Sequence, residues 1–310
     1  MPDQRISIVL PCFNEGSGII KLLQHLEEVL NKHTAHFFDV IIVDDCSIDN
    51  TLALLQSAQL NSKNMKLHIL ELLYNTGHQN CIYQGLLYTE SLQSDFVVIM
   101  DSDGEDNPEA IPAMLEKADY DIVEVKRGKR SESFLFKVLN ICYRLVFYII
   151  TGKKLHYGNF CMLSKNIVER LRLTSFIHLP AYLLKLKVKR TFVTFNRSKR
   201  IDGKSKMGYK NLLLHAFKSF VEFGDDLLLW FLRLFGIIIL LLTGVGTNLL
   251  YQKFISHTAI PGWFSTIAMG LINICVLCIG FFVLGTLLIN LMHNQNKSNQ
   301  RIFRIVKGTE

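Results

Sequence analysis

Charged side chains are absent from two long stretches near the C-terminal end of this 310-residue chain, from Leu234 to Gln252 and from Phe254 to Met292. A hydrocarbon core about 30 Å thick needs about 20 apolar helical residues. The stretches therefore predict two membrane-spanning helices, near 228–251 and 264–291. Two buried core helices are the alternative, but a globular domain has little use for two such runs joined by a short Pro-Gly link.

A secretory signal peptide is also absent, because Met1–Arg5 leads directly into a strand-like run. We therefore expect the N-terminal domain to stay in the cytoplasm. The seven cysteines form no disulfide framework for such a domain, and Cys275 and Cys278 lie inside the second predicted span as two small apolar side chains. Lysines and arginines flank the two spans while the connecting loop holds only Lys253, which predicts that both ends face the cytoplasm.

The net charge of +7 is concentrated locally, since residues 185–210 carry ten Lys/Arg and one acid, Asp202. A nucleic-acid site is one interpretation of such a patch. Beside a membrane span the patch is better suited to anionic lipid headgroups or phosphate substrates, and we expect no nucleic-acid partner.

The first part of the chain alternates strand-like and helix-like runs. Predicted strands at 6–10, 38–43, 66–72 and 96–100 are followed by helical patterns at 18–30, 51–59, 79–92 and after Pro108. This alternation predicts an α/β fold with a mostly parallel sheet flanked by helices, whose ligands bind at the carboxyl ends of the strands. The predicted organisation is an α/β domain (1–210), a juxtamembrane amphipathic helix (211–227), two transmembrane helices (228–292) and a basic cytoplasmic tail (293–310).

Polar residues follow all four predicted strands. Asp101 and Asp103 lie two residues apart at a strand end, so both carboxylates can point the same way, and hard oxygen ligands suit Mg²⁺ or Mn²⁺. A cation held there can bridge a diphosphate and neutralise the charge that grows on a leaving nucleotide. A pair of turn acids is the alternative for a lone D-x-D motif.

Other strand-end residues have two interpretations. Asp49 or Asn50 is suited to cap the following helix, whereas Asp44 and Asp45 exceed what capping needs and could accept from a base N–H or a ribose hydroxyl. His78 is either a core or capping histidine or a donor to the diphosphate.

The motifs PCFNE, VDDCSIDNT, NTGHQNCIYQGL and DSDGEDNPE, followed by RSKRIDGKSK and two spans, resemble glycosyltransferase family 2 with a GT-A type nucleotide-sugar domain. Within it, they are similar to the polyprenyl-phosphate glycosyltransferases of bacterial inner membranes and their dolichol-phosphate counterparts. The resemblance implies a metal-dependent hexosyltransferase that moves a sugar from a UDP or GDP donor to polyprenyl phosphate at the cytoplasmic membrane face. It also implies association into homo-oligomers through the spans.

The resemblance also implies roles for single residues. The nucleotide-sugar pocket would contain Pro11, Asn14, Glu15, Asp44, Asp45, His78, Asp101, Ser102 and Asp103. The metal would be held by Asp101 and Asp103, assisted by Glu105 or Asp106, and the catalytic residues would be Asp101, Asp103, Arg200 and Lys206. The acceptor and its phosphate would meet Lys126, Arg127, Arg130, Asn159, Arg197, Arg200, Lys204 and Ser205.

Three positions depart from the family pattern. Relatives often have Gln at Glu105, and they commonly have Asp or Ser at Asn159 and Arg at Cys161. Asn cannot accept a proton, but a lipid phosphate is already anionic and needs no general base, whereas a sugar hydroxyl usually does. A glycosyltransferase acting directly on a glycan or glycolipid therefore stays an alternative, although the Q-x-x-R-W signature of processive relatives is absent. A non-catalytic nucleotide-sugar-binding scaffold is the second alternative, which the intact acids disfavour.

Apolar and aromatic residues in 134–148 and 212–220 are interspersed with Lys137, Arg144, Lys210 and Lys218. This pattern predicts amphipathic helices on the membrane surface. For the first segment, packing against the core is an equal alternative.

Overall fold

The computed structural model describes residues 4–127, 134–154, 158–174, 176–196, 198, 209–257, 262–295 and 300–308. The strands are β1 (Gln4–Cys12), β2 (His36–Asp44), β3 (Met65–Leu72), β4 (Phe96–Ile99), β5 (Ile122–Arg127), β6 (Cys161–Ser164), β7 (Arg190–Phe195) and β8 (Phe303–Lys307). The helices are α1 (Ser17–Leu30), α2 (Thr51–Ser57), α3 (His78–Leu92), α4 (Ala110–Leu115), α5 (Phe134–Thr151), α6 (Lys165–Thr174), α7 (Leu179–Lys185), α8 (Tyr209–Glu222), α9 (Gly224–Phe254) and α10 (Trp263–Gln295).

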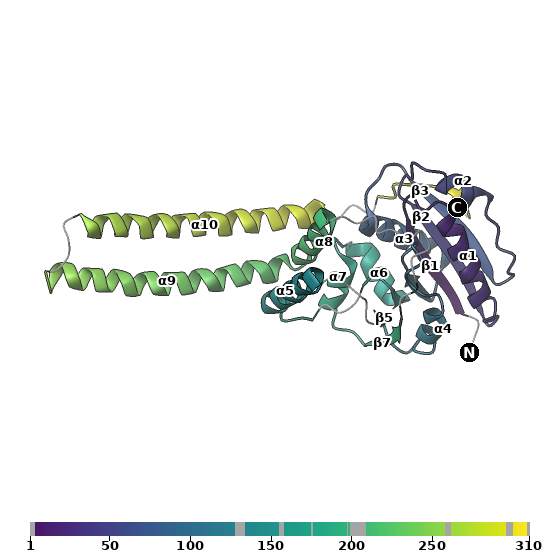
Figure 1. Ribbon diagram of the computed structural model, residues 1–310, viewed down its shortest axis with the longest axis horizontal. Coiled ribbons are helices and arrows are strands. Elements are labelled where there is room, and N and C mark those ends of the chain that lie inside the picture. Colours follow the sequence, from purple (N-terminus) through teal and green to yellow (C-terminus); the bar gives the residue numbers. More distant parts are fainter. Residues whose placement is uncertain are drawn as a thin grey trace.

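One eight-stranded sheet with the order β7-β5-β6-β4-β1-β2-β3-β8 organises the N-terminal domain (Figure 1). β4, β1, β2 and β3 are parallel neighbours, and the predicted strand and helix alternation is confirmed here. β6 runs antiparallel to both β4 and β5, while β5 and β7 are parallel. The chain order reverses at β1, which has β2 on one side and β4 on the other, so ligand binding is expected at the carboxyl ends of these strands.

Helices cover both faces of the sheet. The core on one face joins α1, α2 and α4 to the sheet, and the core on the other face joins α3, α6 and α7 to it. The central strands are buried on both faces, which explains why their sequences are continuous apolar runs rather than alternating ones. α3 crosses β1 closely at Gly85, where a Cβ atom would lie 2.4 Å from Cγ1 of Val9.

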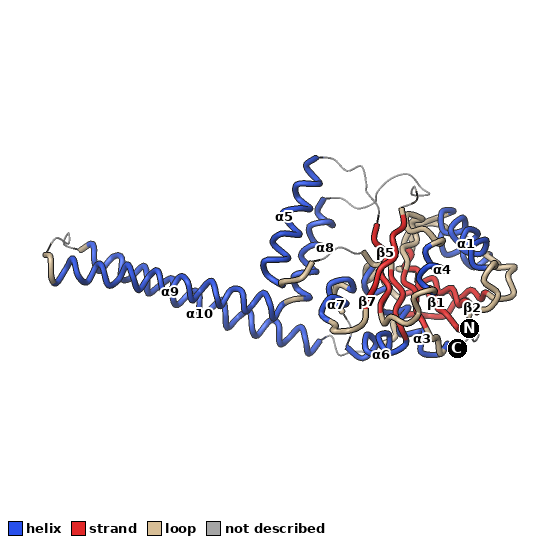
Figure 2. Tube along the Cα trace, turned by 90° about the horizontal axis from the view of Figure 1, so that it is seen from below, coloured by secondary structure: helices blue, strands red, loops and turns tan. Residues whose placement is uncertain are grey.

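α5 and α8 lie where the domain meets the helix pair, and both run across the direction of that pair (Figure 2). Phe147 of α5, Ala181 of α7 and Phe223 form a small buried cluster, so one side of α5 packs inward. Glu222 at the end of α8 accepts hydrogen bonds from the backbone N–H groups of Ile177 (2.8 Å) and His178 (3.2 Å). These contacts fix α8 to the start of α7.

The other side of α5 is apolar and exposed. Among the described side chains of α5, the exposed large hydrophobic ones are Val138, Leu139, Ile141, Leu145, Val146, Tyr148 and Ile149. Both interpretations of this segment therefore apply, because one side of the helix packs in the protein while the other is suited to an apolar surface.

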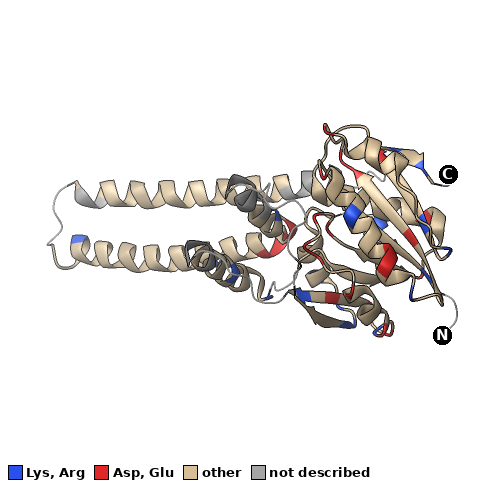
Figure 3. Cartoon of the chain, turned by 45° about the vertical axis from the view of Figure 1, so that its right-hand side comes forward, with Lys and Arg blue, Asp and Glu red and all other residues tan. Residues whose placement is uncertain are grey.

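α9 and α10 form an extended antiparallel pair that projects from the domain (Figure 1). Both are long and apolar enough to cross a membrane, over Gly224–Phe254 and Ser265–Leu288, close to the predicted ranges. Figure 3 shows the acidic and basic residues concentrated on the globular domain, with few along the described parts of this pair.

The C-terminal residues return to the sheet. β8 pairs antiparallel with β3, and ion pairs join Arg304 to Glu71 (2.6 Å) and Arg301 to Glu90 (2.9 Å). The sequence predicted a basic tail at 293–310 but gave no sign that 303–307 form an edge strand. Because β8 completes the sheet that the N-terminal residues begin, the chain enters and leaves the helix pair from the same side.

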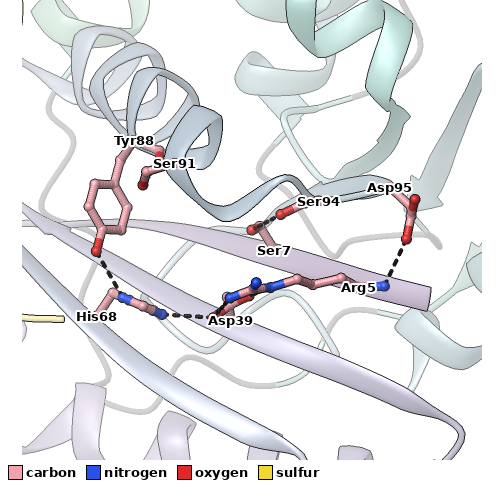
Figure 4. A network of polar contacts seen from close by, with 8 residues as sticks. All are labelled: Arg5, Ser7, Asp39, His68, Tyr88, Ser91, Ser94 and Asp95. Carbon is pink, nitrogen blue, oxygen red and sulfur yellow. Dashed lines mark hydrogen bonds and ion pairs between the residues drawn. The ribbon is translucent and has the colours of Figure 1, made fainter. Parts of the chain in front are cut away.

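A polar network lies between the strands and α3 (Figure 4). Asp39 accepts from Arg5 Nε (2.6 Å), and His68 contacts Asp39 through Nε2 (2.8 Å) and the Tyr88 hydroxyl through Nδ1 (2.9 Å). Burial alone would raise the pKa of Asp39, but hydrogen bonds with His68 and Arg5 lower it below its ordinary value. Gly308 packs against this network so closely that a Cβ atom at this position would lie 2.7 Å from the Tyr88 hydroxyl oxygen.

Candidate active site

The loops after β1 and β2 hold each other in place. The Asn14 N–H donates to Ser47 Oγ (2.9 Å), and Asn14 Oδ1 accepts from the Ile48 N–H (2.9 Å). Asn14 has a φ of 55°, a left-handed conformation that Asn tolerates better than most residues. Pro11 is buried in β1, and the half-buried Glu15 lies in the loop two residues before α1 begins. The residues predicted from PCFNE therefore line the carboxyl end of β1.

Asp44 and Asp45 have different partners. Asp44 is fully buried and accepts from the Ser47 N–H (3.0 Å) and hydroxyl (2.5 Å). Burial raises the pKa of Asp44 above its ordinary value, although the Ser47 bonds oppose that shift. Asp45 accepts from the backbone N–H groups of Thr76 (2.7 Å) and Gly77 (2.8 Å), so its carboxylate fixes the loop that leads into α3.

His78 connects α3 to the Asp101 loop. Its Nε2 lies 3.2 Å from Asp101 Oδ1 and 3.0 Å from Asn159 Nδ2. Gln79 donates to Asn159 Oδ1 (3.1 Å), and its own carbonyl oxygen accepts from the Leu179 N–H (2.7 Å). This chain of amides orients Asn159 with its NH₂ group toward His78.

The two contacts of His78 Nε2 compete. Nε2 accepts from Asn159 when it carries no proton, and it donates to Asp101 when it does. Burial alone would lower the pKa of His78, but the hydrogen bond with Asp101 and the nearby carboxylates of Asp103 and Asp106 raise it above its ordinary value. His78 thus belongs to the acidic edge of the site, and its contacts favour neither a core nor a simple capping role.

The loop after β4 presents its acids in different ways. Asp106 is buried and accepts from the Asp101 N–H (3.2 Å), while Asp103 accepts from the Glu105 N–H (2.9 Å). Ser102, within the same loop, is buried. Asp106 therefore shapes the loop, whereas Asp101, Asp103 and Glu105 are only partly buried.

The metal prediction is compatible with this geometry. Among the residues that the structure describes, no group of three or more His, Cys, Asp or Glu side chains is arranged to hold a metal ion. Mg²⁺ is usually bound by one or two carboxylates plus substrate phosphates. The two carboxylates Asp101 and Asp103 match the number that the protein contributes to a site of this kind.

The predicted acceptor residues are only partly described. Lys126 is exposed and lies over the ring of Phe192, 5.4 Å from its centroid. The backbone of Arg127 ends β5, but its side chain lies outside the described part of the chain, as do Arg130, Arg197, Arg200, Lys204, Ser205 and Lys206. Ser198 is described, and its N–H donates to the carbonyl of Glu105 (3.0 Å), so Ser198 lies beside the loop that follows β4.

The model of glycosyl transferase family 2 matches residues 7–172, more than half of the chain. The chain belongs to glycosyl transferase family 2. This glycosyltransferase is 29% identical over 276 residues to the uncharacterized glycosyltransferase YkoT of Bacillus subtilis (strain 168), covering 84% of this chain and 80% of the relative. It is 28% identical over 224 residues to the undecaprenyl-phosphate 4-deoxy-4-formamido-L-arabinose transferase of Yersinia pestis (strain Pestoides F), covering 68% of this chain and 65% of the relative.

Solved structures show the same fold. The mannosyl-3-phosphoglycerate synthase of Rubrobacter xylanophilus matches with a TM-score of 0.53 and 14% identity, covering 72% of this chain and 74% of that one. The mannosyltransferase PcManGT of Pyrobaculum calidifontis, solved with GDP-Man and Mn²⁺, matches with a TM-score of 0.51 and 17% identity. The match covers 73% of this chain and 66% of that one. The predicted GT-A type fold of this glycosyltransferase is thereby confirmed.

Two polar residues near the site of this glycosyltransferase were not predicted. Gln79 follows His78 directly in the motif NTGHQNCIYQGL. Its side chain forms hydrogen bonds with both Asn159 and the first residue of α7. Glu124 is buried in β5, where an acid interrupts the apolar run IVEV. That interruption was the available sequence signal.

Proposed function

We propose that this glycosyltransferase transfers a sugar from a UDP or GDP donor to a polyprenyl phosphate at the cytoplasmic face of a bacterial inner membrane, with Mg²⁺ or Mn²⁺ as cofactor. The observation that carries the proposal is the combination of an acidic sheet edge, formed by Asp101 and Asp103 beside His78, with two apolar helices suited to span a membrane.

The donor side of the proposal rests on the loops at the carboxyl ends of β1, β2 and β4. The nucleotide would lie against Pro11, Asn14 and Glu15, over the loops that Asp44 and Asp45 hold in shape. A divalent cation bound to Asp101 and Asp103 would supply charge neutralisation for the leaving diphosphate. Arg200 and Lys206 are proposed to contact the same phosphates, since Arg is suited to paired phosphate contacts.

The acceptor side rests on the membrane features and on the relatives. A phosphate oxygen of the lipid would attack the anomeric carbon as the bond from that carbon to the nucleoside diphosphate breaks. The lipid phosphate is already anionic, so Asn159 need not accept a proton. Lys126, Arg127, Arg130, Arg197, Lys204 and Ser205 are proposed to hold that phosphate, and the exposed apolar side of α5 is suited to the membrane surface that presents it.

The orientation in the membrane also has support. Because β8 pairs with β3, the chain leaves and re-enters the domain on one side of the helix pair. Lys/Arg residues flank the pair on that side, which favours a cytoplasmic location for both the domain and the C-terminal residues. Self-association through the spans stays a prediction.

The test uses the full chain, purified in detergent, with undecaprenyl phosphate and a panel of UDP-glucose, UDP-N-acetylglucosamine and GDP-mannose, each with Mg²⁺ or Mn²⁺. We expect equal amounts of lipid-linked sugar and free nucleoside diphosphate with at least one donor. Nucleotide release that requires a glycan and yields no lipid-linked sugar would instead favour the direct glycan transferase. Binding of a donor without any turnover would favour the non-catalytic scaffold.

The Asp103→Ala variant tests the metal role. Loss of a carboxylate that helps to hold the cation should remove several kcal/mol of transition-state stabilisation, and we expect turnover to fall at least about a hundredfold. Asp119, exposed after α4, provides a matched control, since Asp119→Ala removes an acid without touching the site. Undiminished activity in Asp103→Ala would refute the role.

A further inference from the structure

Glu124 is a buried acid that the proposed reaction does not yet use. Only 3% of its surface is accessible. Among the residues that the structure describes, none forms a hydrogen bond with its carboxylate. A buried carboxylate without a partner is costly, so a structural role alone does not explain why an acid stands in this strand.

The register of the strands places Glu124 next to the candidate active site. Cys161 of β6 pairs with Ile99 on one side and with Glu124 on the other. Side chains two positions apart on a strand share a face, so Lys126 of β5 lies one row nearer to the carboxyl end of β4, about 7 Å along the strand. Asn159, two residues before Cys161, precedes β6 at the same end. Glu124 therefore lies one row beneath Asn159, on the sheet face that α3 and α7 cover.

The charged neighbours leave the carboxylate unneutralised. Arg190 of β7 donates to the carbonyls of Leu183 (2.6 Å) and Leu186 (3.1 Å), and Lys126 lies over the Phe192 ring. Cys161 of β6 faces Glu124, and burial raises the pKa of that thiol, which keeps it neutral. Burial also raises the pKa of Glu124 to about 7, although the charge of Arg190 opposes the shift.

The chemistry of a carboxylate limits what it can meet. It would repel the diphosphate of a donor and the phosphate of a lipid, and both are expected at the outer, basic part of the site. A hydroxyl or amino group, in contrast, can donate a hydrogen bond to it. The transferred sugar carries such groups. The ribose and base of the donor carry them too, but they are expected at the loops after β1 and β2, away from β5.

We propose that Glu124 is a specificity-determining residue whose carboxylate accepts a hydrogen bond from a hydroxyl or amino substituent of the transferred sugar. This inference rests on the proposed function. It predicts that Glu124 sets the preference among sugars without contributing to recognition of the nucleotide.

The test compares wild type with Glu124→Gln, which keeps the shape but removes the charge. The measured quantities are kcat/KM for UDP-glucose, UDP-galactose, UDP-N-acetylglucosamine and GDP-mannose, with and without undecaprenyl phosphate, and the Kd for UDP and GDP. We expect the ratio of kcat/KM between preferred and poor sugars to change at least about tenfold, because a hydrogen bond to a charged group is lost. The nucleotide Kd should stay within about twofold, which also shows that the site is folded. Glu90→Gln, at an exposed ion pair with Arg301, is the matched control and should change neither quantity.

The outcomes separate the two proposals. Wild type that turns over none of the four donors contradicts the proposed function itself. Wild-type turnover with unchanged sugar ratios in Glu124→Gln overturns only the role of Glu124. A change that appears with undecaprenyl phosphate but is missing from the donor-only reaction would assign the contact of Glu124 to the acceptor and overturn the sugar assignment.

Discussion

Replacing Glu124 by glutamine should change how the stability of the protein depends on pH. The folded protein disfavours the charged form of this side chain, because burial raises its pKa from 4.5 to about 7. At pH values below 4.5 the group is protonated in both the folded and the unfolded chain, so its ionisation does not change the free energy of unfolding. As the pH rises from 4.5 to 7, the unfolded chain releases the proton more readily, so the folded state loses stability.

The size of this effect follows from the shift. A shift from 4.5 to about 7 is about 2.5 units, and at about 1.36 kcal/mol per unit the folded protein loses about 3 kcal/mol by pH 8. Since 1 kcal/mol moves the melting temperature of a domain of this size by about 2–4 °C, the loss corresponds to about 6–12 °C. Glutamine has no proton to release, so its own cost of burial is the same at every pH.

The assay is differential scanning calorimetry of the purified full chain in detergent between pH 4.5 and pH 8.5. We expect the melting temperature of Glu124→Gln, relative to wild type, to increase by about 6–12 °C between the two ends of this range. Glu90→Gln should show no such trend, because Glu90 is exposed. A constant difference between Glu124→Gln and wild type would refute the reasoning, since it would mean that the carboxyl group does not titrate in this range.

Three further predictions concern packing and loop geometry. Gly85→Ala places a methyl group against Val9 where α3 crosses β1, and we expect a loss of about 1–3 kcal/mol, measured by calorimetry. Asp39→Asn weakens the buried contact with His68 and should lower the free energy of unfolding by about 3–5 kcal/mol at pH 7. Because the pKa of Asp39 is lowered, this loss should shrink as the pH falls below 3.8. A loss that does not depend on pH would contradict the ion pair. Asp45→Ala frees the loop before α3 and should weaken UDP or GDP binding about tenfold in a calorimetric titration, whereas unchanged affinity would mean that this loop does not shape the site.

The sequence predicted the parts of the fold that depend on local pattern. The four parallel strands and the two apolar helices follow from hydrophobic runs whose length and flanking residues are visible in the chain. The antiparallel strand β6 was not predicted, because Cys161–Ser164 is too short to show a period. β8 was missed for a different reason, since its pairing with β3 joins residues more than 200 positions apart.

The site was predictable as a set of loops but not as a set of contacts. Strand-end acids such as Asp101 could be listed, because parallel strands bring their carboxyl ends to one edge. That the Asp45 carboxylate accepts from Thr76 and Gly77, while Asp101 lies by His78, depends on side-chain directions that spacing does not fix. The position of Glu124 near Asn159 follows from the strand register, which the sequence alone does not show.

The central claim is tested most directly by mass spectrometry of lipids from bacterial membranes that express this chain. The account predicts a new polyprenyl phosphate species whose mass is increased by one sugar residue, present with wild type and absent with Asp103→Ala at equal expression. Membranes in which wild type and Asp103→Ala give identical polyprenyl phosphate profiles, despite nucleotide-sugar turnover by the wild type, would contradict it.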